Sequence, residues 1–242
     1  MRKLPAPLRR FAVGLLVVVA LLSPSAITMW VWAPPATDIQ ERVRALTDRY
    51  GVVLLDPDQV PPTLAQAVVA TEDERFYSHH GLDSIGLARA LLYDATNLCL
   101  CQGGSTITQQ LVKDVYLGGS DRGYNKLQGM VLALKVERVI GKRQIMADYL
   151  SEITTGLNRY GVVAAACAYF KAPLSRLTLG QNALLAGVTQ APSLYDPTVD
   201  PTAAQARRDH VLRAMVSDHM ISPAQAAAAT AEPVLLPDGP GC

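Results

Sequence analysis

Two stretches of this chain decide its chemistry and mark its fold: residues 71–81, which read TEDERFYSHHG, and residues 103–114, which read GGSTITQQLVKD. The first places the acid Glu72 near an aromatic residue and histidines, and the second places hydroxyl and amide side chains near Lys113. A carboxyl group that faces polar and cationic groups is suited to sugar or phosphate chemistry. We therefore take the two stretches as a candidate catalytic site carried by helices.

The composition favours one sizeable domain. The chain has 242 residues, 50% of them hydrophobic, which is enough for a single core. Its net charge of +1 gives no argument for binding nucleic acid. Its four cysteines are too few for a disulfide scaffold and lack the spacing of zinc ligands. We expect Cys167 to be a plain core residue, whereas Cys242 can pair with Cys99 or Cys101 in an oxidising compartment.

The N-terminus has the features of a membrane anchor. Basic residues within segment 1–10 precede an apolar segment, residues 11–33, that is long enough to span a bilayer. We predict a signal anchor that keeps residues 1–10 in the cytoplasm and exports the remainder. The alternative is a signal peptide cleaved near Ala26, because Pro24 and small residues interrupt the apolar run. Either interpretation places the following residues outside the cytoplasmic membrane.

Helical periodicity predicts a mainly α domain. Pro61 and Pro62 open a helix that delivers Glu72 at its C-terminal end. Segment 126–153 reads as one long helix, or as two joined near Gly141. We expect the helix over residues 82–98 to point its apolar side chains inward, namely Ile85, Leu87, Ala88, Leu91 and Leu92. Other segments are predicted as a strand over residues 52–55 and as helices over residues 38–50, 161–170 and 222–230.

The helix that begins near Ser105 presents polar groups in register. Two glycines followed by Ser105 and Thr106 are typical of a helix start. The spacing lets Thr106, Gln109 or Gln110, and Lys113 line one face. Such a helix N-terminus suits phosphate or sugar oxygens. The plain alternative is a capped helix with a solvated face.

Together the two stretches resemble the first two motifs of the peptidoglycan glycosyltransferases (glycosyltransferase family 51). This family comprises the glycan-polymerising domain of penicillin-binding proteins and the monofunctional transglycosylases. Residues 126–145, 149–150 and 179–195 resemble its third, fourth and fifth motifs in order. The resemblance implies a two-lobed, lysozyme-like domain over residues 51–220, after a connector at 34–50 and before a tail at 221–242. Its smaller, membrane-facing lobe would consist mainly of residues 110–140. Because no transpeptidase motif occurs in the sequence, we expect a monofunctional chain.

The resemblance also implies a reaction. In the family, the 4-hydroxyl group of an acceptor sugar attacks the anomeric carbon of a lipid-linked glycan, the configuration inverts, and lipid pyrophosphate leaves. Glu72 would be the general base. Asp73, Phe76 and His79 would belong to the substrate-binding set through the loop that they shape. The donor sugar and pyrophosphate would be held by Ser105, Thr106, Gln109, Gln110, Lys113 and Lys126.

The same resemblance implies partners and a location. The expected partners are lipid II, the nascent glycan strand, the membrane and other cell-wall synthases, and nucleic acid is not expected. A divalent cation, Mg²⁺ or Mn²⁺, would bridge the pyrophosphate, although the sequence contains no dedicated metal site and indicates no organic cofactor. The expected location is the cytoplasmic membrane, crossed once, with the catalytic domain on the outer side.

One departure from the family pattern bears on activity. Gly129 stands where the family has a second glutamate, three residues after Lys126 and four before Ala133. Pyrophosphate is a good leaving group, so this loss is expected to slow the reaction rather than abolish it. Two hypotheses follow: a glycan polymerase of reduced activity, or a non-catalytic homologue that binds lipid II or a cell-wall synthase and regulates it. A lytic enzyme has no need of the predicted pyrophosphate face. The smaller departures are Asn125, Ser151, Gln181, Lys171 and Ala172.

The remaining polar residues receive structural interpretations. Glu137 lies too far round its helix to replace the missing glutamate and is expected to serve structure. His210 and His219 are expected at the surface rather than as metal ligands. We expect a solvated helix face, with contact to anionic lipid as the alternative, for Arg207, Arg208 and Arg213.

Overall fold

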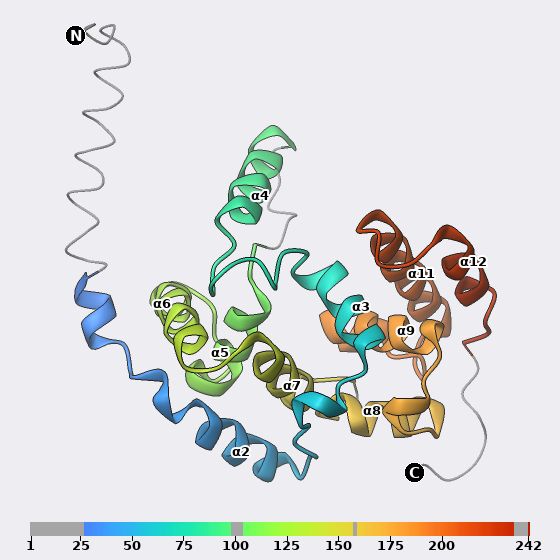
Figure 1. The fold of residues 1–242 in the computed structure, drawn as a ribbon, viewed down its shortest axis with the longest axis horizontal. Helices are drawn as coiled ribbons and strands as arrows, with labels where there is room; N and C mark the ends of the chain where they lie inside the picture. The colour runs from blue at the N-terminus through green and yellow to red at the C-terminus, as the bar shows by residue number, and fades with distance from the viewer. Residues whose placement is uncertain (1–26, 98–103, 157–158, 235–241) are drawn as a thin grey trace, which may run out of the picture.

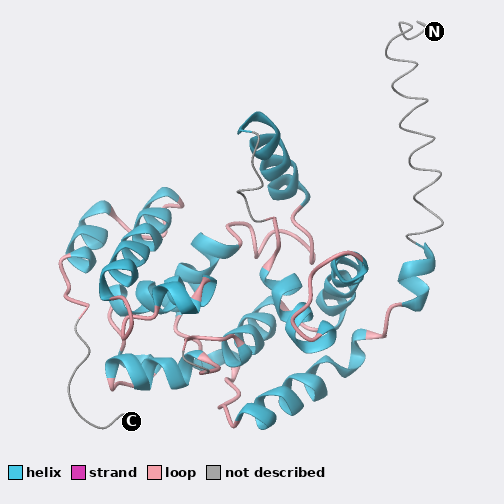
Figure 2. Ribbon diagram, turned by 180° about the vertical axis from the view of Figure 1, so that it is seen from behind, coloured by secondary structure: helices cyan, strands magenta, loops and turns pink. Residues whose placement is uncertain are grey.

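The computed structural model describes residues 27–97, 104–156, 159–234 and 242, and within these ranges every regular element is a helix (Figure 2). The prediction of a mainly α chain is therefore confirmed. The elements in chain order are η1 (Ala36–Asp38), α2 (Ile39–Tyr50), η2 (Pro57–Gln59), α3 (Pro62–Glu72), α4 (Ser84–Asn97), α5 (Ile107–Leu117), α6 (Tyr124–Val139), α7 (Lys142–Glu152), α8 (Val162–Phe170), η3 (Leu174–Arg176), α9 (Leu179–Gln190), α10 (Pro192–Tyr195), α11 (Pro201–Ser217) and α12 (Pro223–Thr230).

One group of helices is built around α3. Helices α9 and α11 pack on α3 and on each other, with α8, α10 and α12 at their edges (Figure 1). The contact is made by aliphatic side chains that are fully buried, among them Leu64 and Val68 of α3, Leu185 of α9, and Val211 and Met215 of α11. Burial of this size stabilises a helix group by about 1.5–3 kcal/mol per side chain. This group fixes the end of α3, where Glu72 lies.

A second group is built around α5. Helices α6 and α7 pack on α5, and α2 lies against α5 and α7. Ile107 and Leu111 of α5, Leu132 of α6, Ile145 of α7 and Val43 of α2 are fully buried in it. A single hydrophobic cluster runs through both groups, and Gln110 of α5 donates a hydrogen bond to Glu72 at the end of α3. The two stretches quoted at the outset therefore meet where the groups join.

The helix boundaries confirm most sequence predictions, and the predicted strand is wrong. The segment over residues 126–153 is divided, because Ile140 and Gly141 leave the helical conformation between α6 and α7. Residues 52–55 are irregular. The backbone N–H of Leu55 donates to Ser151 Oγ at 2.9 Å, a side-chain acceptor rather than a neighbouring strand. The apolar run indicated burial correctly, since Leu55 is in the core, but burial alone does not make a strand.

Helix α4 contradicts the inward orientation that its pattern predicts. The helix projects away from the body of the molecule (Figure 1). Ile85 is 66%, Leu87 39% and Leu92 68% exposed, and Ala88 is also exposed. The Leu91 side chain lies outside the described part of the structure. Periodicity identified an apolar face correctly, but it cannot say whether another element covers that face.

The first described residues are tied to α6. Residues 27–32 are helical, and the Trp30 ring faces the Arg138 guanidinium at 4.6 Å and Lys135 Nζ at 5.2 Å. Lys135 Nζ also donates to the carbonyl oxygen of Ala33 at 2.6 Å. Within the described ranges, no helix is both long and apolar enough to cross a membrane. Residues 1–26, which include most of the predicted anchor, lie outside those ranges.

The cysteine predictions are corrected by a disulfide. Cys167 of α8 is bonded to Cys242, with the two Cα atoms 5.3 Å apart. Cys167 is therefore a cross-link rather than a plain core residue, and the pairing of Cys242 with Cys99 or Cys101 is wrong. The bond joins positions 75 residues apart, a contact that follows from the fold and not from local sequence. Cys99 and Cys101 lie outside the described residues.

Candidate functional site

Glu72 is the last residue of α3 and lies at the junction of the two helix groups. The helix stops there because Asp73 adopts a non-helical backbone conformation, with φ −161° and ψ 73°. The Glu72 side chain is 9% exposed. Its Oε2 accepts a hydrogen bond from Gln110 Nε2 at 2.9 Å, whereas Oε1 is buried and lies 3.9 Å from Arg207 Nη2. The carboxylate is thus held on one side by an amide and faces a cation on the other.

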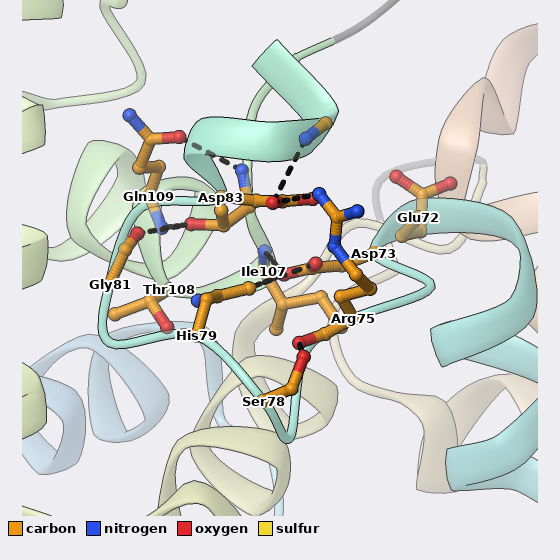
Figure 3. Close-up of polar contacts among 12 residues, drawn as sticks. Glu72, Asp73, Arg75, Ser78, His79, Gly81, Asp83, Ile107, Thr108 and Gln109 are labelled. Carbon is orange, nitrogen blue, oxygen red and sulfur yellow. Dashed lines mark hydrogen bonds and ion pairs between the residues drawn. The ribbon is translucent and has the colours of Figure 1, made fainter. Parts of the chain in front are cut away.

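Asp73 fastens the loop that follows Glu72 to the start of α5 (Figure 3). Its carboxylate lies 2.9 Å from His79 Nε2 and accepts from the backbone N–H of Ile107 at 3.1 Å. Burial raises the pKa of Asp73, and the contact with His79 opposes that shift. Lys142 Nζ lies 3.4 Å from His79 Nδ1. These bonds hold the loop in place, and Asp73 also lines the cavity beside Glu72, whereas His79 is not among the residues that line it.

Gly81 connects the 71–81 loop to the start of α5 and to the middle of α6. It has φ +86°, and a Cβ atom added there would lie 2.8 Å from the backbone of Ala133 in α6. Its carbonyl oxygen accepts from Thr106 Oγ1 at 2.7 Å. Only glycine allows both the left-handed conformation and this close approach. The loop of residues 71–81, the start of α5 and the middle of α6 are consequently one packed unit.

Thr106 and Gln109 cap the N-terminus of α5. Thr106 Oγ1 accepts from the backbone N–H of Gln109, and Gln109 Oε1 accepts from the N–H of Thr106 at 2.9 Å. Thr106 is 2% exposed. Because these groups already bond to the protein, the structure gives Thr106 and Gln109 a structural task, and their contact with substrate stays a prediction. Phe76 is likewise fully buried, with Lys142 Nζ 4.4 Å from its ring centre.

Gln110 is the α5 amide that reaches Glu72. While its Nε2 donates to Glu72, its Oε1 accepts from the hydroxyl group of Tyr149 at 3.2 Å. Tyr149 is fully buried in α7, so the orientation of the amide is fixed from behind. Burial raises the pKa of Tyr149 well above its usual range, and the charge of Glu72 adds to the shift. Tyr149 therefore remains a hydroxyl donor at neutral pH and holds the NH₂ end of Gln110 toward Glu72.

A cavity of about 180 Å³ contains both predicted phosphate-binding lysines. Lys126 Nζ donates to Ser105 Oγ at 2.5 Å, and Lys113 Nζ lies 3.5 Å from Asp114. The cavity is lined by Ser105, Gln109, Gln110, Lys113, Leu117, Asp121, Asn125, Lys126 and Gly129. Two ammonium groups with hydroxyl and amide neighbours are suited to the oxygens of a diphosphate.

Gly129 forms part of the wall of this lysine cavity. It lies in α6 with helical backbone, and a Cβ atom added there would meet Leu117 Cδ1 at 3.4 Å, an ordinary contact. A Cβ atom therefore fits at this position without displacing backbone. Glu137, the next glutamate in α6, accepts from Thr108 Oγ1 at 2.5 Å and from Lys142 Nζ at 2.6 Å. These bonds agree with the structural task predicted for Glu137.

The donor set does not fit a dedicated metal site. In the described ranges, no three His, Cys, Asp or Glu side chains lie close enough together to hold a metal ion. Asp121 is the one carboxylate among the residues that line the lysine cavity. Mg²⁺ commonly needs carboxylate or phosphate oxygens. We therefore derive no chemical step through a divalent cation.

A second cavity, of about 450 Å³, is lined by Glu72 and shares Ser105 with the lysine cavity. Its walls come from α3, the 71–81 loop, α4, α9 and α11, and none of its lining residues is a lysine. Polar lining residues include Glu72, Glu74, Asp83, Arg89, Ser105, Gln190 and His210. The three acids other than Glu72 have partners: Asp73 bonds to His79, Glu74 to Arg89, and Asp83 to Arg75. Glu72 and Ser105 thus border a cavity without lysine, while Ser105 also borders the lysine cavity.

Arg207 and Arg208 were expected on a solvated face, and this prediction is wrong. Arg207 is 8% and Arg208 2% exposed. Arg207 Nε donates to the carbonyl oxygen of Gly187 at 3.4 Å, its guanidinium lies 5.7 Å from the Tyr195 ring centre, and Nη2 faces Glu72. Arg208 donates to carbonyl oxygens at the end of α12. A sequence signal existed, because positions 208, 211, 212 and 215 share the apolar face of α11.

The cleft holds a carboxylate backed by Arg207 beside a cavity with two lysines, which defines a site for chemistry on a sugar or a phosphate. Residues 40–216 match the sequence profile of the family described as Transglycosylase. The chain belongs to this family, and it contains a peptidoglycan glycosyltransferase (transglycosylase) domain.

Similar proteins carry the same domain within longer chains. The chain is 42% identical over 176 residues to penicillin-binding protein 1A of Haemophilus influenzae, covering 73% of this chain and 21% of that one. Identity to the Vibrio cholerae protein of the same name is 40% over 178 residues, or 74% and 22% of the two chains. A crystal structure of the Haemophilus influenzae protein matches with a TM-score of 0.46 at 23% identity, covering 76% of this chain and 18% of that chain. The chain thus spans about a fifth of these relatives.

Proposed function

We propose that this chain polymerises lipid II into β-1,4 glycan strands with inversion at the anomeric carbon and release of undecaprenyl pyrophosphate. The observation that carries the proposal is the position of Glu72. It lines a cavity without lysine, and the neighbouring cavity, which shares Ser105, contains Lys113 and Lys126. A general base must contact the hydroxyl group that it deprotonates, and a leaving pyrophosphate is stabilised by cations. The two cavities supply these requirements on adjacent sides of one cleft.

The geometry supports one arrangement of the reactants, with the incoming hydroxyl group at Glu72 and the leaving pyrophosphate at the two lysines. Glu72 Oε1 is buried against Arg207, so Oε2 is the oxygen through which Glu72 meets an incoming hydroxyl group. Oε2 accepts one bond from Gln110 and retains a lone pair for the proton. As the hydroxyl oxygen bonds to the anomeric carbon, the bond from that carbon to pyrophosphate breaks. The electron pair leaves with pyrophosphate, whose charge Lys113 and Lys126 stabilise.

Several features support a site at the outer surface of the cytoplasmic membrane. The N-terminal segment is predicted as an anchor, and a disulfide is typical of an exported domain. Ile85 and Leu92 of α4 expose apolar area on a projecting helix, which suits contact with lipid. The two helix groups support the two-lobed arrangement that the resemblance implies. We include the membrane, the nascent strand and other cell-wall synthases among the proposed partners.

One observation favours a second function. Gly129 borders the lysine cavity where the family pattern has a carboxylate, so the cavity keeps its cations but lacks that acid. Such a site can bind the diphosphate of lipid II without turning it over. The alternative is therefore a non-catalytic homologue that binds lipid II or a cell-wall synthase and regulates it. A bridging Mg²⁺ or Mn²⁺ ion belongs to either proposal only as a companion of the substrate phosphates.

Polymerisation by the full chain in detergent tests the two functions directly. Lipid-linked disaccharide is the substrate, and the variants are Glu72→Gln and Glu74→Gln. Both remove one carboxylate charge, but Glu74 is exposed and its carboxylate pairs with Arg89. We expect glycan from the native chain and from Glu74→Gln, and none from Glu72→Gln. Equal product from Glu72→Gln would contradict the assignment of the base. No product from the native chain, with lipid II binding retained, would establish the regulator.

A further inference from the structure

His210 lies on the wall of the cavity beside Glu72, a position that the reaction described so far leaves without a task. It belongs to α11, three residues after Arg207, and residues at this spacing share a helix face. Arg207 extends from that face to Glu72. His210 therefore borders the cavity one helical turn from the residue that faces the base. Gln190, the last residue of α9, lines the same cavity.

The chemistry of this wall suits an uncharged polar ligand. His210 is exposed rather than packed in the core. Partial burial and the charges of Arg207 and Arg213 lower the pKa of His210, so the imidazole is neutral near pH 7. A neutral imidazole has one donor and one acceptor nitrogen, and the Gln190 amide also offers both. Sugar hydroxyl and acetamido groups match this combination, because each donates and accepts hydrogen bonds.

The two cavities differ in charge, which separates their ligands. Both lysines of the site line the smaller cavity, which suits a diphosphate. The larger cavity contains Glu72, and each of its remaining acids is paired: Glu74 and Asp83 with arginines, and Asp73 with a histidine. A sugar whose hydroxyl group is to be deprotonated by Glu72 must enter this larger cavity. The ring of that sugar then lies within the space that His210 borders.

We propose that His210 is a specificity-determining residue that hydrogen-bonds the acceptor amino sugar and directs its reactive hydroxyl group toward Glu72. The inference rests on the proposed function, since it concerns the sugar that gives up its proton to Glu72. It differs from the expectation that His210 is only a surface residue. It assigns no proton transfer to His210, which acts as a ligand of the sugar.

Binding by the full chain in detergent tests the proposal without requiring turnover. The first probe is a soluble β-1,4-linked oligosaccharide of N-acetylglucosamine and N-acetylmuramic acid, which has neither lipid nor pyrophosphate, and the second is inorganic pyrophosphate. His210→Phe keeps a ring of similar size and loses both nitrogens, whereas His210→Asn restores a donor and an acceptor. Gln205→Phe is the matched control, because it places the same ring on an exposed position of α11 outside the cavity.

We expect His210→Phe to weaken oligosaccharide binding by about 2- to 12-fold, the factor that corresponds to one net hydrogen bond of roughly 0.5–1.5 kcal/mol. Pyrophosphate binding should be unchanged, His210→Asn should recover part of the affinity, and Gln205→Phe should behave as the native chain. Unchanged oligosaccharide affinity in His210→Phe, or no oligosaccharide binding by the native chain, would overturn the inference. Polymerisation measured in parallel separates the two proposals, because His210-dependent sugar binding without polymerisation refutes only the proposed enzyme activity.

Discussion

Restoring a carboxylate at position 129 is the change that most directly tests how this site works. Gly129 is helical and buried, and its added Cβ atom would meet only Leu117 Cδ1 within 4 Å, at 3.4 Å. The side chain of Gly129→Glu can therefore extend into the cavity of about 180 Å³ that holds Lys113 and Lys126.

The structure gives separate magnitudes for stability and for rate. Replacing glycine by glutamate or glutamine in a helix interior stabilises it by roughly 0.5–1 kcal/mol. For a domain of this size we expect the melting temperature to rise by about 1–4 °C. If the carboxylate acts as one electrostatic stabiliser of the transition state, worth about 2.7–4 kcal/mol, the rate of polymerisation rises by about 100- to 1000-fold. The gain in rate is thus far larger than stability alone explains.

Initial rates of glycan formation from lipid-linked disaccharide measure the effect. Gly129→Gln is the matched control, because it has the same length and a similar helix propensity but no charge. Both variants should be more stable than the native chain, and only Gly129→Glu should be faster. A Gly129→Glu chain that melts at the temperature of Gly129→Gln, binds lipid II and polymerises no faster than the native chain would refute the reasoning. Position 129 would then have no part in catalysis.

Three further predictions concern buried groups. Arg207→Met should lower the free energy of unfolding by about 3 kcal/mol, because it leaves the Glu72 carboxylate without its facing cation. In urea unfolding, the same substitution should cost less in a Glu72→Gln background, and an equal cost in both backgrounds would contradict this pairing. Burial raises the pKa of Glu152 well above its usual range, so above about pH 4.5 the unfolded chain releases a proton that the folded chain keeps, and stability falls by about 1.4 kcal/mol per pH unit. Glu152→Gln should remove the slope that begins above about pH 4.5 in urea unfolding, and a slope that persists in this variant would come from another group. Gly81→Ala should cost at least about 2 kcal/mol in thermal unfolding, through its positive φ and its contact with Ala133, and an unchanged melting temperature would contradict that contact.

Helices and their ends were predictable because local sequence determines them. The two prolines at the start of α3 and the interruption at Gly141 are features of a few neighbouring residues, and the structure follows both. The cap at Thr106 was predictable in the same way, since a Ser or Thr followed three residues later by Gln is a capping signal. The sequence left open whether Gln109 or Gln110 faces the site. Both line the lysine cavity, and only the structure shows that Gln109 caps α5 while Gln110 is the amide that reaches Glu72.

Contacts between distant segments were not predictable in this way. Arg207 lies 135 positions after Glu72 in the chain, and only the packing of α11 on α3 brings them together. Ile85 and Leu92 have the periodicity of a buried face, yet no pattern within α4 reports that the helix projects from the body. Periodicity states which residues share a face, and the identity of what covers that face is a property of the whole fold.

The disulfide between Cys167 and Cys242 places one part of the site inside a closed covalent ring and leaves the other part outside it. Cys167 and Cys242 close a ring of chain that contains α9, α10, α11 and α12, and therefore Arg207 and His210. Glu72 and the lysine cavity lie on the chain before the ring. A protease cut within the ring, for example between α10 and α11, would leave both fragments joined until a reductant is added. The cation that faces the base thus belongs to a closed covalent loop, while the base itself belongs to an open chain.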